Sequence, residues 1–218
     1  MSSGPEPTTL APPAERLADR LEARPTRRGS AAVLALHEIA AIDRAVYGAI
    51  ANTPTPTIDE PLRRLSNLAG RSKLWLGVAG VLFGLGGPTG RRVAVTGVVA
   101  VGVTSAVVNL PIKFAARRAR PDRDTAGVPG QRRVPMPETT SFPSGHSASG
   151  FAFAGAVGAS LPGLAVPLRG LAALVAYSRV HTGVHYPGDV LVGSLLGTTI
   201  GQATAVAARP TTRGRFRR

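Results

Sequence analysis

The stretch VAVTGVVAVGVTSAVVNLPI, residues 93–112, decides the fold, because it holds twenty consecutive residues without a charge. A helix of about twenty apolar residues is long enough to cross the hydrocarbon core of a bilayer. Arg91 and Arg92 precede the stretch and Lys113 follows it, so cations flank the apolar segment at both ends. The sequence therefore predicts a transmembrane helix here.

Four more stretches of the 218-residue chain lack charge, although some are short for a full span: 74–87, 148–168, 170–178 and 190–208. Pro162, Gly163 and Pro167 divide the second stretch into a helix and a turn. We predict an all-α fold, a polytopic transmembrane bundle of about five helices near 74–88, 93–116, 146–161, 166–181 and 189–208.

The remaining segments are polar or amphipathic. Residues 1–30 mix prolines with charges and have no secretory signal segment, which predicts a disordered arm. Residues 31–51 place apolar and charged side chains at helical spacing, which favours an amphipathic helix on the membrane surface. We expect interfacial helices over 31–72, a membrane domain over 73–208 and a basic tail over 209–218. If residues 31–51 cross the membrane, the bundle has six spans.

Small residues recur where membrane helices are expected to touch. Gly80 and Gly84 stand four residues apart, as do Gly193, Gly197 and Gly201. This spacing puts each set on one helix face and allows close backbone approach in lipid. Trp75, near a helix start, is predicted to anchor that helix at the membrane interface.

The charge balance points to an anionic partner. Lys and Arg total 26 against 12 Asp and Glu, a net charge of +14, and there is no cysteine. A basic balance suits nucleic acid, an anionic membrane or an anionic substrate. The arginines lie at helix ends and tails without a recognition motif, so we expect no nucleic-acid partner. The absence of cysteine excludes disulfides, thiolate catalysis and cysteine metal sites.

Ionisable residues gather at the ends of the predicted helices. Because each helix crosses once, an exit and the next entry return to the same membrane face, which brings these residues together: Lys113, Arg120, His146, Arg179, His185 and Asp189. Three cations with one acid need an anion to complete the site, and arginine suits phosphate. The segment 143–146 opens a helix, whose free N–H groups also favour an anion.

Two histidines can divide the work of phosphoryl transfer, one as nucleophile and one as acid for the leaving oxygen. Asp189 follows His185 by four residues, on the same helical face, and is placed to fix the imidazole tautomer.

At these residues the chain resembles the type 2 phosphatidic acid phosphatase (PAP2) superfamily, which also contains vanadium haloperoxidases and bacterial acid phosphatases. Three motifs carry the resemblance. The first is Lys113 with Arg120-Pro121, the second is Pro143-Ser144-Gly145-His146, and the third is Ser178-Arg179 with His185 and Asp189. They span residues 113–189, and the helices around them extend the resemblance to about 70–208.

The resemblance implies a role for each motif residue. His185 attacks phosphorus and becomes phosphohistidine, Asp189 orients it, and His146 protonates the leaving oxygen. The implied phosphate-binding residues are Lys113, Arg120, Ser144, Gly145 and Arg179. No metal or cofactor is implied.

The hydrophobic helices, in turn, suggest a multi-pass enzyme of the cell membrane. Its expected substrate is a lipid phosphate, such as a polyprenyl phosphate or diphosphate, phosphatidic acid or phosphatidylglycerol phosphate. The sequence does not decide which membrane face carries the site, or the oligomeric state.

Alternatives remain at this point. His181, His185 and Asp189, each four residues apart, could form a metal-binding face. The arginines of the loop, namely Arg117, Arg118, Arg123, Arg132 and Arg133, suit either a solvated loop or contacts to headgroups. A soluble-type acid phosphatase, a haloperoxidase-like enzyme and a helical membrane protein without catalysis are the other classes.

Overall fold

A computed structural model describes residues 31–108, 112 and 116–209. These residues form helices and loops without a strand, which confirms the all-α prediction. The helices are α2 (Ala31–Asn52), α3 (Pro56–Leu68), α4 (Lys73–Leu85), α5 (Gly87–Val107), α7 (Gly145–Ser160), α8 (Ala165–His181) and α9 (Pro187–Ala207). Three 3₁₀ turns connect them: η1 (Gly70–Ser72), η3 (Gly130–Arg132) and η4 (Pro162–Leu164). The predicted arm over 1–30, residues 210–218 and most of 109–116 lie outside the described residues.

Local start signals explain the helix boundaries. Ser144 caps α7 by accepting a hydrogen bond from the Ser147 N–H, and Pro56, Pro88 and Pro187 stand in the first turns of α3, α5 and α9. The predicted helices at 146, 166 and 189 begin within two residues of α7, α8 and α9.

The connection between α4 and α5 is much shorter than predicted. The sequence suggested a loop over 89–92, but α5 already begins at Gly87, directly after Gly86. Gly87 has a φ of 61°, and a Cβ on Gly90 would lie 2.4 Å from the Leu82 carbonyl oxygen. Gly87 and Gly90 therefore allow a tighter turn than the predicted loop over residues 89–92.

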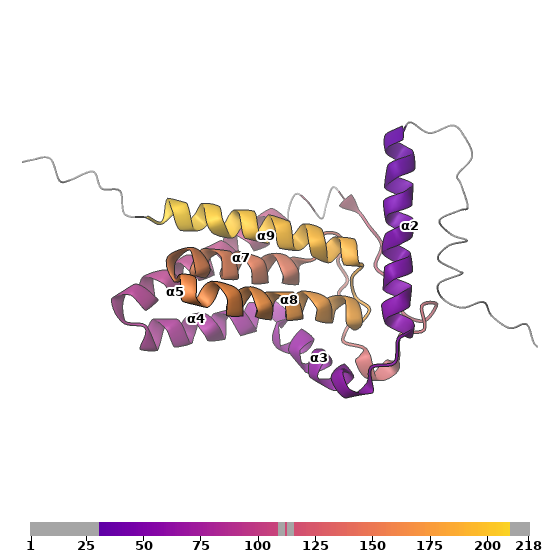
Figure 1. Cartoon of the computed structure of the whole chain (residues 1–218), viewed down its shortest axis with the longest axis horizontal. Helices are drawn as coiled ribbons and strands as arrows, with labels where there is room; N and C mark the ends of the chain where they lie inside the picture. The colour runs from indigo at the N-terminus through magenta and orange to yellow at the C-terminus, as the bar shows by residue number, and fades with distance from the viewer. Residues whose placement is uncertain (1–30, 109–111, 113–115, 210–218) are drawn as a thin grey trace, which may run out of the picture.

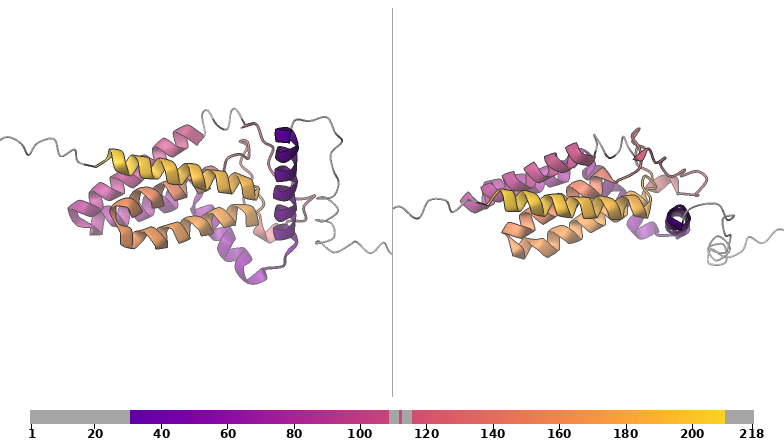
Figure 2. Two further views of the ribbon diagram at one scale, coloured as in Figure 1. Left: turned by 45° about the horizontal axis from the view of Figure 1, so that its top comes forward. Right: turned by 90° about the horizontal axis from the view of Figure 1, so that it is seen from above.

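Helix α7 is the centre of the bundle. It packs against α5, α8 and α9, which lie side by side with it in both sets of views (Figures 1 and 2). Its core residues include Ala148, Ala152, Phe153, Ala156 and Val157, all fully buried. The active-site motif at its start is therefore held by three neighbouring helices.

Trp75 belongs to this core and is not an interface anchor. It is 1% exposed, stacks on Phe153 with ring centroids 5.6 Å apart, and contacts the backbone at Gly150, where a Cβ would lie 2.8 Å from the indole. The prediction from its position near a helix start was wrong, because α4 turns this side chain toward α7.

Two helices, α5 and α9, are long and apolar enough to cross a membrane by themselves. The pair α3 and α4, bent by 65° at η1, meets the same criterion as one broken span. Helices α4, α7 and α8 have 13, 16 and 17 residues and fall short of the usual length of about twenty. The fold is that of a helical membrane protein, and the number of spans stays a prediction.

Helix α2 runs across the end of the bundle. It stands upright beside the bundle helices in Figure 1 and is seen along its axis in the right-hand view of Figure 2. Asp43, Tyr47 and Ala51 form its buried face, whereas apolar side chains elsewhere on it are exposed: Val33, Leu36, Ile39, Ile42 and Val46. Among the described residues, nothing covers this apolar face, and membrane binding by it stays a prediction.

The two glycine sets differ. A Cβ on Gly193, Gly197 or Gly201 would lie 2.1–2.5 Å from a carbonyl oxygen of Ser144, Ala148 or Ala152, respectively. This face of α9 therefore packs directly on the α7 backbone from Ser144 to Ala152. Gly80 and Gly84 have no such neighbour within 4 Å, and Gly80 instead lines an apolar groove between α4 and α5. The prediction of helix contact is confirmed for α9 and wrong for α4.

Gly197→Ala should destabilise the bundle. Its methyl group would meet the fixed Ala148 carbonyl, and overpacking of this kind costs about 1–3 kcal/mol, or roughly 3–10 °C in Tm for a chain of this size. Thermal unfolding in detergent, followed by circular dichroism, measures the shift. Gly170→Ala on α8, where nothing lies within 4 Å, is the control and should not lower Tm. Equal Tm values for the two variants would contradict this packing.

Candidate active site

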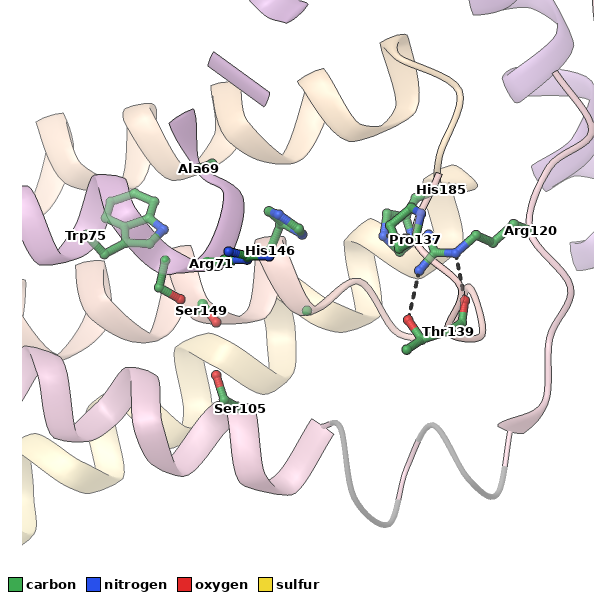
Figure 3. A pocket seen from close by; sticks show the side chains of 12 residues that line it. Ala69, Arg71, Trp75, Ser105, Arg120, Pro137, Thr139, His146, Ser149 and His185 are labelled. Carbon is green, nitrogen blue, oxygen red and sulfur yellow. Dashed lines mark hydrogen bonds between the residues drawn. The ribbon is translucent and has the colours of Figure 1, made fainter. Parts of the chain in front are cut away.

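A cavity of about 380 Å³ opens where α7 begins and the α8–α9 turn approaches it. This volume is within the range of small-ligand sites. Four predicted site residues line it, namely Arg120, Gly145, His146 and His185 (Figure 3). They come from the loop after α5, from the first turn of α7 and from the α8–α9 turn. The structure therefore brings all three motifs to one end of the bundle.

His185 is held rigidly in the turn between α8 and α9. Gly183, with a φ of 76°, makes the turn, and the Arg179 carbonyl accepts hydrogen bonds from the N–H groups of Val184 and His185 at 3.1 and 3.2 Å. The side chain is only 2% exposed. Its Nε2 lies 3.3 Å from Arg120 Nη1. A guanidinium only donates hydrogen bonds, so Nε2 is the unprotonated nitrogen, whose lone pair is directed toward Arg120.

The surroundings keep the His185 imidazole neutral. Burial lowers its pKa to about 4, and the charges of Arg120 and Arg179 act in the same direction, while Asp189 opposes them. An imidazole with an ordinary pKa near 6.5 is partly protonated at neutral pH. His185 therefore keeps a lone pair for attack throughout the neutral and mildly acidic range.

Asp189 lies behind His185, away from the cavity. Its Oδ2 is 3.5 Å from His185 Nδ1 and accepts hydrogen bonds from the Ser141 hydroxyl and, at 2.9 Å, from the Tyr186 N–H. Its Oδ1 pairs with Arg118 at 2.8 Å. This arrangement directs the carboxylate at Nδ1 and so leaves Nε2 to face the cavity.

Arg120 is oriented by backbone oxygens. Its guanidinium donates to the carbonyls of Val184, at 2.7 Å, and Thr139, at 2.7 Å, and also to Thr140. No carboxylate pairs with it among the described residues. Carbonyls fix the direction of the guanidinium without neutralising it, which leaves its charge for an anion in the cavity.

Sequence reasoning missed the residues that connect α2 with this site. Arg118 is 27% exposed and bridges Asp189 to Asp43, with Nη2 2.6 Å from Asp43 Oδ2. Asp43 is 8% exposed, and its other oxygen accepts the Gly188 N–H at 2.6 Å, at the start of α9. The sequence contains one signal for this contact. Asp43 is an acidic residue on the buried face of a mostly apolar helix, and a buried carboxylate needs a partner.

Two of the predicted phosphate ligands, Ser144 and Arg179, do not line the cavity, and a third cannot be placed. Lys113 lies outside the described residues. Ser144 is fully buried, and its hydroxyl caps α7. Arg179 is buried and donates to the Ser66 hydroxyl at 2.5 Å, while its Nε has no hydrogen-bond partner among the described residues. Phosphate binding by these three residues stays a prediction.

His181 belongs to a separate buried network. Its Nε2 lies 2.9 Å from Asp59 Oδ1, which also pairs with Arg132 at 2.8 Å. His181 and His185 thus face different carboxylates, and the described part of the chain holds no group of three metal-ligating side chains. Arg132 is buried and donates to the carbonyls of Ile50, Ala51 and Thr53 at the end of α2. This loop arginine is therefore neither solvated nor available to a headgroup.

The neutral state of His185 can be measured directly. In protein labelled with ¹⁵N-histidine, the resonance lost in His185→Asn should titrate with a midpoint near pH 4, because burial and two cations disfavour the imidazolium. A His185 midpoint at or above about 6.5, the value of an ordinary imidazole, would contradict the electrostatic account.

Two proteins of known activity are similar to this chain in sequence. Decaprenylphosphoryl-5-phosphoribose phosphatase of Mycobacterium tuberculosis is 34% identical over 174 residues, covering 80% of this chain and 88% of that protein. Undecaprenyl-diphosphatase of Sulfolobus acidocaldarius is 34% identical over 137 residues, covering 60% of this chain and 62% of that protein.

Two crystal structures share the fold. The PAP2 type phosphatidylglycerolphosphate phosphatase of Bacillus subtilis has a TM-score of 0.62 at 21% identity and covers 93% of this chain and 97% of its own. Aquifex aeolicus LpxE has a TM-score of 0.60 at 24% identity and covers 75% and 94%. The model of the PAP2 superfamily matches residues 94–213, which contain all three motifs. This chain belongs to the PAP2 superfamily.

Proposed function

We propose that this protein is a phosphatase of the cell membrane that removes a terminal phosphate from a polyprenyl-linked substrate through a phosphohistidine. One observation carries the proposal: in a single cavity, the Nε2 lone pair of His185 faces the uncompensated guanidinium of Arg120, with Asp189 behind the imidazole. A neutral nucleophile next to an anion-binding cation is what phosphoryl transfer requires.

The reaction proceeds in two steps. His185 Nε2 attacks phosphorus, forming the N–P bond as the bond to the leaving oxygen breaks, and His146 donates a proton to that oxygen. Water then attacks the phosphohistidine, His146 accepts its proton, and the N–P bond breaks to release phosphate. Arg120 and the N-terminus of α7 at Gly145 stabilise the phosphoryl oxygens. Asp189 stabilises the imidazolium form in both steps.

The membrane setting supports a lipid substrate. The cavity lies at the end of a bundle that contains two candidate spans, and α2 presents an exposed apolar face at the same end. An apolar helix face beside the site suits binding at the lipid surface, where a phosphate headgroup is within reach. Both curated relatives are named for polyprenyl substrates, which favours this class over glycerophospholipids.

Loss of the nucleophile should abolish turnover. His185→Ala is expected to reduce phosphate release in detergent by at least about 10³-fold, because it removes the imidazole at which the N–P bond forms in the proposed mechanism. His37→Ala, which removes an exposed histidine from α2, is the matched control and should retain activity. Vanadate should inhibit the wild type as an analogue of the transition state, and EDTA should have no effect. Retained hydrolysis by folded His185→Ala would overturn the assignment of the nucleophile.

Removal of the Arg118 bridge should impair catalysis while leaving binding nearly intact. Arg118→Ala leaves Asp43 and Asp189 without their shared cation, and a misplaced catalytic group lowers kcat by about 10- to 100-fold. KM should change much less, because Arg118 does not line the cavity. Arg133→Ala, in the same loop but paired with exposed Asp124, is the control. An unchanged kcat in Arg118→Ala would show that Asp189 is positioned without this bridge.

A further inference from the structure

Arg71 is a cation of the active-site cavity that none of the three motifs includes. Its backbone is left-handed, with a φ of 51° and a ψ of 33°, and Ser72 follows with a φ of 58°. These two residues make the 65° bend between α3 and α4. A left-handed conformation costs a non-glycine residue about 1–2 kcal/mol. The bend places the Arg71 side chain in the cavity wall rather than on the outside of a continuous helix.

The position of Arg71 relative to the two histidines is informative. In Figure 3, His146 lies between Arg71 on one side and His185 with Arg120 on the other. His185 and Arg120 hold the phosphate under attack, and His146 protonates the leaving oxygen in the proposed mechanism. Arg71 is therefore on the side to which the leaving group extends.

The lining of this side suits a polar, negatively charged leaving group. Ser72, Ser105 and Ser149 lie there with Arg71, and no acidic side chain lines the cavity among the described residues. Arg71 has no carboxylate partner in the described part of the chain. An alcohol without charge needs no guanidinium, whereas a phosphorylated leaving group needs one.

An apolar groove that can take the lipid portion begins one residue further along α4 than the wall of this cavity. Trp75 of α4 lines the cavity, and its neighbour Leu76 already lines an apolar groove of about 340 Å³ between α4 and α5. Phe83, Val95 and Val98 continue that groove. A charged group at Arg71 followed by an apolar chain along α4 matches a leaving group that is itself a lipid phosphate.

We propose that Arg71 binds a second phosphate of the substrate, carried by the leaving group, and so selects lipids with two phosphates over lipid monophosphates. This inference rests on the proposed phosphatase function. Two kinds of substrate have a phosphorylated leaving group. One is a prenyl diphosphate, and the other is a prenylphosphoryl sugar phosphate, in which a sugar separates the two phosphates.

The test compares three substrates in detergent: farnesyl monophosphate, farnesyl diphosphate and farnesylphosphoryl-5-phosphoribose. Arg71→Gln should lower kcat/KM for a substrate with two phosphates by about 10- to 100-fold and change the monophosphate by less than about 3-fold. Arg71→Lys should restore part of the loss, because it restores the charge without the planar fork. Lys73→Gln removes a nearby exposed cation that does not line the cavity and should leave all three rates unchanged.

The outcomes separate this inference from the function on which it rests. If Arg71→Gln lowers kcat/KM only for the diphosphate, or only for the phosphoribose lipid, the result supports the subsite and identifies the kind of substrate that it binds. An equal loss on all three substrates, or no loss on any, overturns the role of Arg71 while the phosphatase function stands. A folded wild-type protein that releases phosphate from none of the three overturns both. Thermal unfolding of each variant confirms that the fold is retained.

Discussion

Asp189 is completely buried, and an ionised carboxylate removed from water is strongly disfavoured unless donors and cations replace its hydration. Here four groups replace the water. Arg118 and the Ser141 hydroxyl belong to the loop between α5 and α7, the Tyr186 N–H begins α9, and His185 comes from the turn after α8. The carboxylate is satisfied only when all four groups are in place. The same contacts that stabilise Asp189 therefore position His185, the proposed nucleophile.

The large positive charge has a structural use that composition alone does not indicate. The loop over 116–144 has little regular secondary structure, so many of its carbonyls lack a helical partner. Guanidinium groups supply donors in place of backbone N–H groups: Arg123 binds the Val134 carbonyl, Arg133 binds that of Val128, and Arg132 binds the carbonyls at the end of α2. Arginine suits this work because one side chain presents five donors. These three arginines therefore serve the fold rather than the substrate.

Much of this architecture follows from local sequence, and the exceptions share one physical cause. Uncharged runs bounded by proline and serine predicted α7, α8 and α9 to within two residues, and the turn topology predicted that Arg120, His146 and His185 converge. The misjudged residues depend on contacts distant in sequence. Trp75 is buried by α7, and Arg118 is held by acids 75 residues before and 71 residues after it. Neither contact leaves a periodic signal, so only the three-dimensional arrangement shows it.

The glycine face of α9 also sets the distance between His146 and His185, the two histidines of the proposed mechanism. His146 is the second residue of α7 and His185 stands two residues before α9, so their separation depends on how far one helix is shifted along the other. Gly193, Gly197 and Gly201 fit against the carbonyls of Ser144, Ala148 and Ala152, each pair one helical turn from the next. A shift of one turn would move one histidine by about 5.4 Å relative to the other. Because the proposed acid stands on α7 and the proposed nucleophile in the turn before α9, these three glycines fix the separation of the two groups. Residues far from any phosphate thus determine whether proton transfer and attack can occur on the same bond.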